Sequence, residues 1–186
     1  MTRWFEESGA QWTAEVLGLV AERLEVGGLK HVIIATTSGA TGARFAEALR
    51  DRNVDVVCVT HHAGFVAGDE NQLQPGHAAA IEAAGGVILT ASHALSGVGR
   101  SISKSFGGTT SIEVIAHTLR LFGQGMKVCV EIAVMAADAG LIPTDRDVLC
   151  VGGTGRGADT AVVLRASHAS RFFEMRIRET LCRPIG

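Results

Sequence analysis

The sequence predicts an α/β protein in which helices cover both faces of a mostly parallel sheet. Short apolar runs rich in β-branched residues alternate with longer segments of helical period. The apolar runs are nearly continuous, which is typical of strands buried on both faces. A chain of 186 residues fits a single domain, 1–186, that is large enough to bury a core.

The first third of the chain predicts a helix, then a strand–turn–helix unit, then a second strand. Residues 12–26 place apolar side chains on one helical face, and Gly27-Gly28 ends that helix. His31 to Ala35 is a short β-branched run, and Ala43 to Leu49 returns to helical spacing. Val54 to Thr60 is another buried strand.

The middle of the chain predicts three further helices and one strand. Pro75 begins a helix that stops at Gly85-Gly86, and residues 87–90 form the third strand. A Gly- and Ser-rich stretch is followed by a helix over about 109–122. The alternation within 125–140 could indicate a strand, but AADAG favours a helix with a glycine stop.

The end of the chain predicts a hairpin and a closing helix. VLCVGG, 148–153, and TAVVLRA, 160–166, read as two strands. Their connection is tight, so we expect them to pair antiparallel. FFEMRIRETL, 172–181, is expected to be helical.

Composition excludes several classes of partner. With 17 basic and 19 acidic residues the net charge is −2, which disfavours nucleic acid and anionic membranes as partners. Only 19% of residues are charged, which indicates a homo-oligomer with some covered surface. The first residues lack the apolar core of a signal peptide, so we expect a cytoplasmic protein. Four cysteines without a CxxC pair predict packing residues and no metal site.

The turn TTSGATG, 36–42, lies between a strand and a helix and could bind an anion. Glycine allows close backbone approach, and the first N–H groups of a helix lack internal partners at the positive end of its dipole. Four hydroxyls add hydrogen-bond donors for phosphate oxygens. The alternative is an ordinary helix N-cap by Ser38 or Thr41. The segment is neither a Walker loop nor GxGxxG.

A second glycine-rich loop, GGTGRGADT at 152–160, favours the binding interpretation. Four glycines in six residues suit a backbone that approaches a ligand, and Arg156 offers a planar fork for phosphate or carboxylate. In a doubly wound sheet both loops would face the crevice at the carboxyl ends of neighbouring strands. Arg156 could equally lie at an exposed hairpin tip or subunit contact.

Other polar residues are weaker candidates. His61 and His62 follow a strand at the same edge, and either could act as an acid or base, although no nucleophile can be assigned to them. Arg100 and Lys104 would form a cationic patch if their segment is helical, or a solvated surface. For Glu131 inside an apolar helix we favour structural pairing with a Lys or Arg over a ligand role.

The chain resembles the C-terminal α/β domain of pyruvate kinase. In that domain a T-x-T-G-R-S loop holds an effector phosphate; Thr36, Ser38, Gly39 and Thr41 match this pattern, and Ala40 replaces its arginine. More specifically, the chain is similar to a stand-alone pyruvate kinase C-terminal-like family, mostly archaeal. The matching segments are VTHHAGF, HALSGVGRSISKSFGG, GMKVCVEIAVMAADAG and VGGTGRGADTAVVLRASH.

The resemblance implies a three-layer α/β/α sandwich whose five-stranded sheet has the order 3-2-1-4-5 and an antiparallel last strand. It also implies flavin mononucleotide, FMN, in the crevice, as in some members. The barrel in which pyruvate kinase performs its chemistry has no counterpart here, so that activity is not expected. The residues expected to contact the ligand are Thr36, Thr37, Ser38, Gly39, Ala40, Thr41, His61, Arg100, Lys104, Gly152, Gly153, Thr154, Gly155 and Arg156.

The sequence therefore predicts a protein that binds a phosphorylated ligand, most plausibly FMN, between two glycine-rich loops. Two alternatives stay open. One is an enzyme, either a flavin-dependent oxidoreductase or one acting on a phosphorylated metabolite, with His61 or His62 as the acid–base group. The other is an effector-sensing regulatory domain.

Overall fold

A computed structural model describes residues 1–66 and 68–185 of the chain. Its centre is one mixed sheet with the strand order β1-β7-β6-β5-β2-β3-β4. The strands are β1 (Arg3–Phe5), β2 (His31–Ala35), β3 (Asp55–Thr60), β4 (Val87–Thr90), β5 (Asp147–Gly152), β6 (Thr160–Arg165) and β7 (Arg176–Pro184). The helices are α1 (Thr13–Glu25), α2 (Ala40–Leu49), α3 (Pro75–Ala83), α4 (Gly97–Phe106), α5 (Ser111–Arg120) and α6 (Gln124–Asp138), with the short 3-10 helices η1 (Ala10–Trp12) and η2 (Ala169–Glu174).

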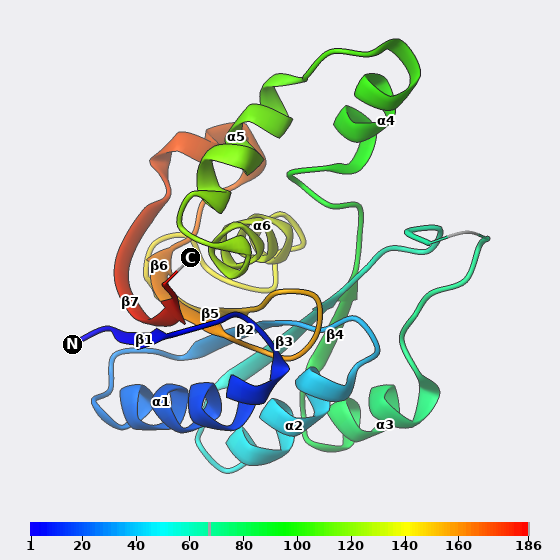
Figure 1. Ribbon diagram of the computed structural model, residues 1–186. Helices are drawn as coiled ribbons and strands as arrows, with labels where there is room; N and C mark the ends of the chain where they lie inside the picture. Colours follow the sequence, from blue (N-terminus) through cyan, green and yellow to red (C-terminus); the bar gives the residue numbers. More distant parts are fainter. Residues whose placement is uncertain (67, 186) are drawn as a thin grey trace.

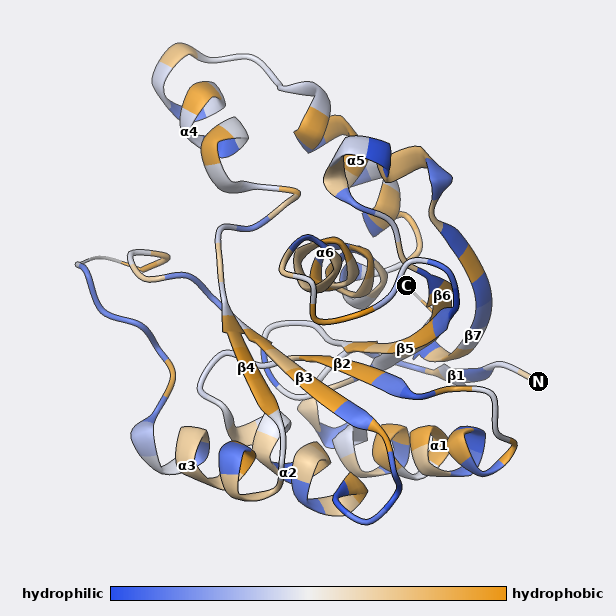
Figure 2. Ribbon diagram, turned by 180° about the vertical axis from the view of Figure 1, so that it is seen from behind, coloured by the Kyte–Doolittle hydropathy of each residue, from blue (hydrophilic) through white to orange (hydrophobic). Residues whose placement is uncertain are grey.

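Helices cover both faces of the sheet, as predicted. Figure 1 shows α1, α2 and α3 below the sheet and α6 above it, with α5 and α4 further out on the upper side. One core cluster packs the sheet against the lower helices, with Ile34 and Phe45 at its centre. A second cluster packs Ile33 and Val57 against α6, most of which is buried. β3 and β4 are largely hydrophobic (Figure 2); β3 is buried from Val56 to Thr60, whereas β4 lies at the edge of the sheet and is only partly buried.

The expected sheet of five strands is wrong, because the sheet has seven and its full order is therefore different. The five expected strands are β4, β3, β2, β5 and β6, which are neighbours in that sequence. β5 and β6 pair antiparallel from Asp147↔Arg165 to Gly152↔Thr160, so the hairpin is confirmed. The additional strands β7 and β1 extend the sheet beyond β6.

The expected closing helix at 172–181 is also wrong. The chain forms η2 and then β7, which pairs antiparallel with β6 and parallel with β1. Without β7, β6 would present a row of unpaired backbone groups along a buried strand, at a high cost in free energy. This tertiary requirement overrides the helical spacing of the local sequence.

Two further predictions agree with the structure, whereas β1 and the helix α4 were not predicted. The segment from 125 to 140 lies in and just beyond α6, so the preference for a helix is confirmed. All four cysteines are buried and free, which confirms the packing interpretation. Within residues 1–66 and 68–185, no helix combines the length and apolarity needed to cross a bilayer.

Candidate functional site

A cavity of about 800 Å³ opens where β2, β3 and β5 end. From β2 the sheet continues through β3 to β4 on one side and through β5 on the other, so β2 and β5 flank the point at which the strand order reverses. Ligands of open α/β sheets bind at this point. Residues of both glycine-rich loops line the cavity, so the two loops face one site, as predicted.

The first loop presents backbone amides without internal partners. α2 begins at Ala40, after Gly39 in the left-handed conformation with φ +91°. The Gly42 amide donates to Thr36 Oγ1 at 3.2 Å, and the Ala40 amide makes only a long contact of 3.5 Å with Ser38 Oγ. Within the described residues, no acceptor is found for the amides of Thr37, Ser38, Gly39 and Thr41. These donors could bind an anion at the positive end of the helix dipole.

Most of the predicted first-loop residues line the cavity, but Gly39 does not. The lining residues of this loop are Thr36, Thr37, Ser38, Ala40 and Thr41. A Cβ at Gly39 would meet Leu73 Cδ1 at 2.7 Å and His77 Cβ at 2.6 Å. Gly39 therefore permits the turn and its packing against α3, and does not itself make room for a ligand.

The second loop divides between ligand-facing and structural positions. Gly153, Gly155, Arg156 and Gly157 line the cavity, whereas Gly152 and Thr154 do not. A Cβ at Gly152 would lie 2.6 Å from the Gly125 carbonyl oxygen, so this glycine allows α6 to approach the sheet. The exposed guanidinium of Arg156 forms no ion pair within the described residues, so it can engage an anion.

Asp159 organises the second loop, a role that the sequence analysis missed. Its side chain is fully buried and accepts hydrogen bonds from the Gly9 amide at 3.1 Å, the Thr154 amide at 3.1 Å and Thr160 Oγ1 at 2.7 Å. The Thr154 amide is thus occupied by the protein itself. The one sequence signal for this role is the position of Asp159, an acidic residue at the end of a glycine-rich loop whose amides need acceptors.

One face of α6 forms the wall of the cavity. Its lining residues are Gln124, Val128, Glu131, Ile132 and Met135. Glu131 forms a buried ion pair with Lys127 and accepts a hydrogen bond from the Leu95 amide at 2.9 Å, so the expected pairing is confirmed. Burial lowers the pKa of Lys127, while Glu131 acts in the opposite direction.

A cluster of rings lies beside the cavity at the ends of β3 and β4. His61 and His93 line the cavity with Phe65, whereas His62 does not. The His61 and Phe65 rings stack at 3.9 Å, and the His61 Nδ1–H donates to Gln72 Oε1 at 2.9 Å. Burial lowers the pKa of His93 from 6.5 to about 4, although the Glu131 carboxylate opposes this shift. His93 is therefore neutral at pH 7.

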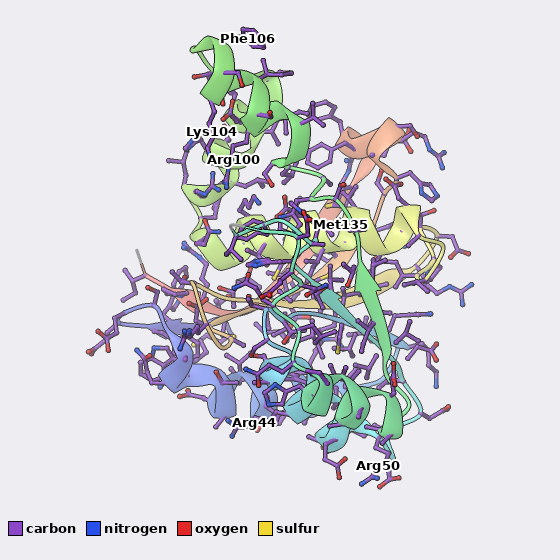
Figure 3. The ribbon with its side chains drawn as sticks, turned by 90° about the vertical axis from the view of Figure 1, so that its right-hand side faces the viewer. Arg44, Arg50, Arg100, Lys104, Phe106 and Met135 are labelled. Carbon is purple, nitrogen blue, oxygen red and sulfur yellow. The ribbon has the colours of Figure 1, made fainter. Side chains whose placement is uncertain are left out.

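Arg100 and Lys104 lie on α4 and do not line this cavity. They line a second cleft of about 340 Å³ together with His62. Figure 3 shows both cations on α4, well above the sheet. Across 1–66 and 68–185, no group of three or more His, Cys, Asp or Glu side chains is arranged to hold a metal ion.

Residues 14–164 match the family model described as pyruvate kinase, alpha/beta domain. The chain belongs to this family. The pyruvate kinase alpha/beta-domain match runs from the start of α1 to the end of β6, so both glycine-rich loops and α6 fall within it. β7 lies outside it and extends the sheet of this family member.

Two solved structures show weak similarity to this pyruvate kinase alpha/beta-domain protein. O-ureido-L-serine synthase is 17% identical with a TM-score of 0.32, over 71% of this chain and 48% of that chain. The SAH-bound methyltransferase PaMTH1 of Podospora anserina is 14% identical with a TM-score of 0.32, over 78% and 53%. The present chain thus spans about half the length of each.

Proposed function

We propose that this protein binds a phosphorylated small molecule in the cavity between the loops at 36–42 and 152–159, and that FMN is the best candidate. The observation on which the proposal rests is that the first loop, with its unpaired amides, and Arg156 of the second loop line one cavity. An oxyanion would satisfy several of these amides at once.

The phosphate is proposed to lie against the first turn of α2. The amides of Thr37 and Thr41 and the hydroxyls that line this turn supply donors, and Arg156 supplies positive charge. The Glu131 carboxylate also lines the cavity and would repel a phosphate. We therefore expect the rest of the ligand to extend toward Glu131 and the ring cluster.

The other lining residues suit a planar, partly apolar group. Val128, Ile132 and Met135 form an apolar wall, and the stacked rings of Phe65 and His61 provide a flat surface. The volume of about 800 Å³ falls within the roughly 300–1,000 Å³ typical of sites for ligands of this size. When bound, a flavin supplies hydride or electron transfer, while the protein would bind and orient it.

Binding can be tested by calorimetry with FMN and riboflavin. Arg156→Gln should weaken FMN binding about 10- to 100-fold, because a charge-assisted hydrogen bond is lost, and should leave riboflavin binding nearly unchanged. Arg44→Gln is the matched control, since Arg44 is exposed on α2, below the sheet (Figure 3), and does not line the cavity. Equal affinity of the wild-type protein for riboflavin and FMN would refute the phosphate role. Mass spectrometry of the co-purifying molecule would identify the ligand.

Catalysis is a second candidate function, favoured by the neutral His93 beside His61 at the cavity wall. A general base must reach its proton directly or through one water, and both imidazoles line the cavity. His61→Ala should then slow turnover by much more than it weakens ligand binding. If reduced flavin is not reoxidised by any physiological acceptor, and sugar phosphates stabilise the protein more than FMN does, effector sensing becomes the better interpretation.

Self-association is proposed as well. Val98, Ile102 and Phe106 repeat every four residues along α4 and are 77%, 47% and 85% exposed. An exposed apolar stripe of this kind is typical of a protein interface. Light scattering should give a mass above that of one chain, and Phe106→Glu should reduce it to the monomer value.

A further inference from the structure

We propose that the cleft beside α4 is a second ligand site, which holds a small dianionic molecule with phosphate or carboxylate oxygens. This α4 cleft has a volume of about 340 Å³ and is lined in part by Ser96, Gly97, Arg100 and Lys104. It is distinct from the cavity between the glycine-rich loops, and the proposal does not depend on what that cavity binds.

The charges around the α4 cleft are unbalanced. Arg100 and Lys104 are one helical turn apart on the same face of α4. Within residues 1–66 and 68–185 neither forms an ion pair, and no Asp or Glu lines the cleft. Glu113, which contacts α4 through Ser103, is already engaged by Ser103 and Thr110. The positive charge of the cleft is therefore available to a ligand.

Unpaired hydrogen-bond donors add to this charge. The cleft includes the N-terminal end of α4, a helix of ten residues that has no acidic residue in its first turn. The amides of Gly97, Val98 and Gly99 have no acceptor among the described residues. Ser96 lines the cleft and is only 9% exposed, yet its hydroxyl makes no hydrogen bond within the described chain. A hydroxyl that faces the cleft and helix N-terminal amides that lack partners are the groups that an oxyanion can satisfy.

The α4 cleft lies next to the first cavity, and the two share one lining residue, Phe65. Phe65 lines both hollows, and His62 lines the cleft. The rings of His62 and His93 approach to 5.1 Å, and those of Phe65 and His93 also to 5.1 Å. A molecule in the cleft would lie beside the ring cluster, across Phe65 from a molecule in the first cavity. This position suits a second, anionic ligand that acts together with the first.

The apolar stripe of α4 does not compete for this face. On α4, each cationic residue is two positions from the nearest residues of the stripe Val98, Ile102 and Phe106. Two positions correspond to about 200° around the helix, so Arg100 and Lys104 lie on the opposite face. Self-association through the stripe would therefore leave the cationic face open.

The test is a titration of isotope-labelled full-length protein with inorganic phosphate and, separately, with succinate, followed by amide NMR. At least one of the two should shift the amides of Ser96 and Gly97 in a saturable manner. Arg100→Gln with Lys104→Gln should weaken that binding at least 10-fold, because both cations are lost. Both residues are exposed, so the fold should survive, and Arg44→Gln is again the control.

The amides that respond distinguish this proposal from the proposed function. Shifts confined to 37–41 and 153–157 would support the first cavity and overturn the α4 cleft. Shifts at Ser96 and Gly97 that depend on Arg100 would support the cleft whatever happens in the first cavity. A response to phosphate or to succinate identifies the class of oxyanion, and no response at Ser96 and Gly97 to either would overturn the proposal.

Discussion

Replacing Glu131 by glutamine should destabilise the protein by about 3–5 kcal/mol, because it leaves the ammonium group of Lys127 buried without a counter-charge. Lys127 is 4% exposed and Glu131 5% exposed, so water cannot replace the lost carboxylate. Glutamine can still accept the Leu95 amide hydrogen bond, since its side-chain oxygen is retained. The cost therefore measures the unpaired charge.

Urea denaturation would measure the change in the free energy of unfolding, and thermal denaturation would measure the change in Tm. For a chain of 186 residues each kcal/mol corresponds to about 2–4 °C in Tm, so we expect a decrease of about 6–20 °C. The control is Glu47→Gln, which breaks the exposed pair between Glu47 and Arg50 and should cost less than about 1 kcal/mol. The double variant Lys127→Met with Glu131→Gln should recover most of the loss, because it removes both buried charges and keeps an acceptor for the Leu95 amide.

The dependence on pH gives a second measurement of the same effect. The pKa of Lys127 is already lowered by burial, and Glu131 is the group that raises it, so Glu131→Gln should lower it further. Between that lowered pKa and the ordinary value, the unfolded chain binds more protons than the folded chain. The stability of the variant should therefore rise with pH across this interval. A loss below about 1 kcal/mol, or a double variant no more stable than the single one, would refute the reasoning.

Three further substitutions or measurements test other parts of the structure. Gly39→Ala should cost about 1–3 kcal/mol in urea denaturation, because φ is +91° and a Cβ would lie 2.6 Å from His77 Cβ. Gly27→Ala, at φ +84° in open space, should cost less, and equal costs would contradict the steric explanation. His93 should titrate near pH 4 in NMR, because burial lowers its pKa, so stability should fall as the pH drops from about 6.5 toward 4; a midpoint near 6.5 would contradict this. Asp159→Ala should cost at least about 3 kcal/mol and speed hydrogen exchange of the Thr154 amide, with Asp159→Asn as the milder control.

The phosphate-binding proposal depends on local chemistry that could be recognised in the chain itself. The run from Thr36 to Gly42 combines glycines and hydroxyls between a strand and a helix, and this pattern constrains the backbone within a few residues. For the same reason the helix at 125–140 and the hairpin of β5 and β6 were predictable. Their periods, turn residues and glycine stops lie within the segments themselves.

Contacts between distant segments were not predictable in this way. The C-terminal segment has the spacing of a helix but forms β7, because the edge of β6 requires a partner. Gly39 resembles a ligand-facing glycine, yet its Cβ position faces His77, which is 38 residues away. Arg100 and Lys104 belong to a separate cleft, although their sequence equally suited the first cavity.

The sequence by itself determined the α/β class, the alternation of most strands and helices, and the two loops that face the main cavity. These features follow from periodicity and turn chemistry, which act over a few residues. Only the tertiary structure decided the two added strands β1 and β7, the choice of Lys127 as the partner of Glu131, the role of Asp159 and the division into two hollows. These depend on which surfaces meet when the chain packs, and on the free energy of leaving a buried charge or backbone group without a partner.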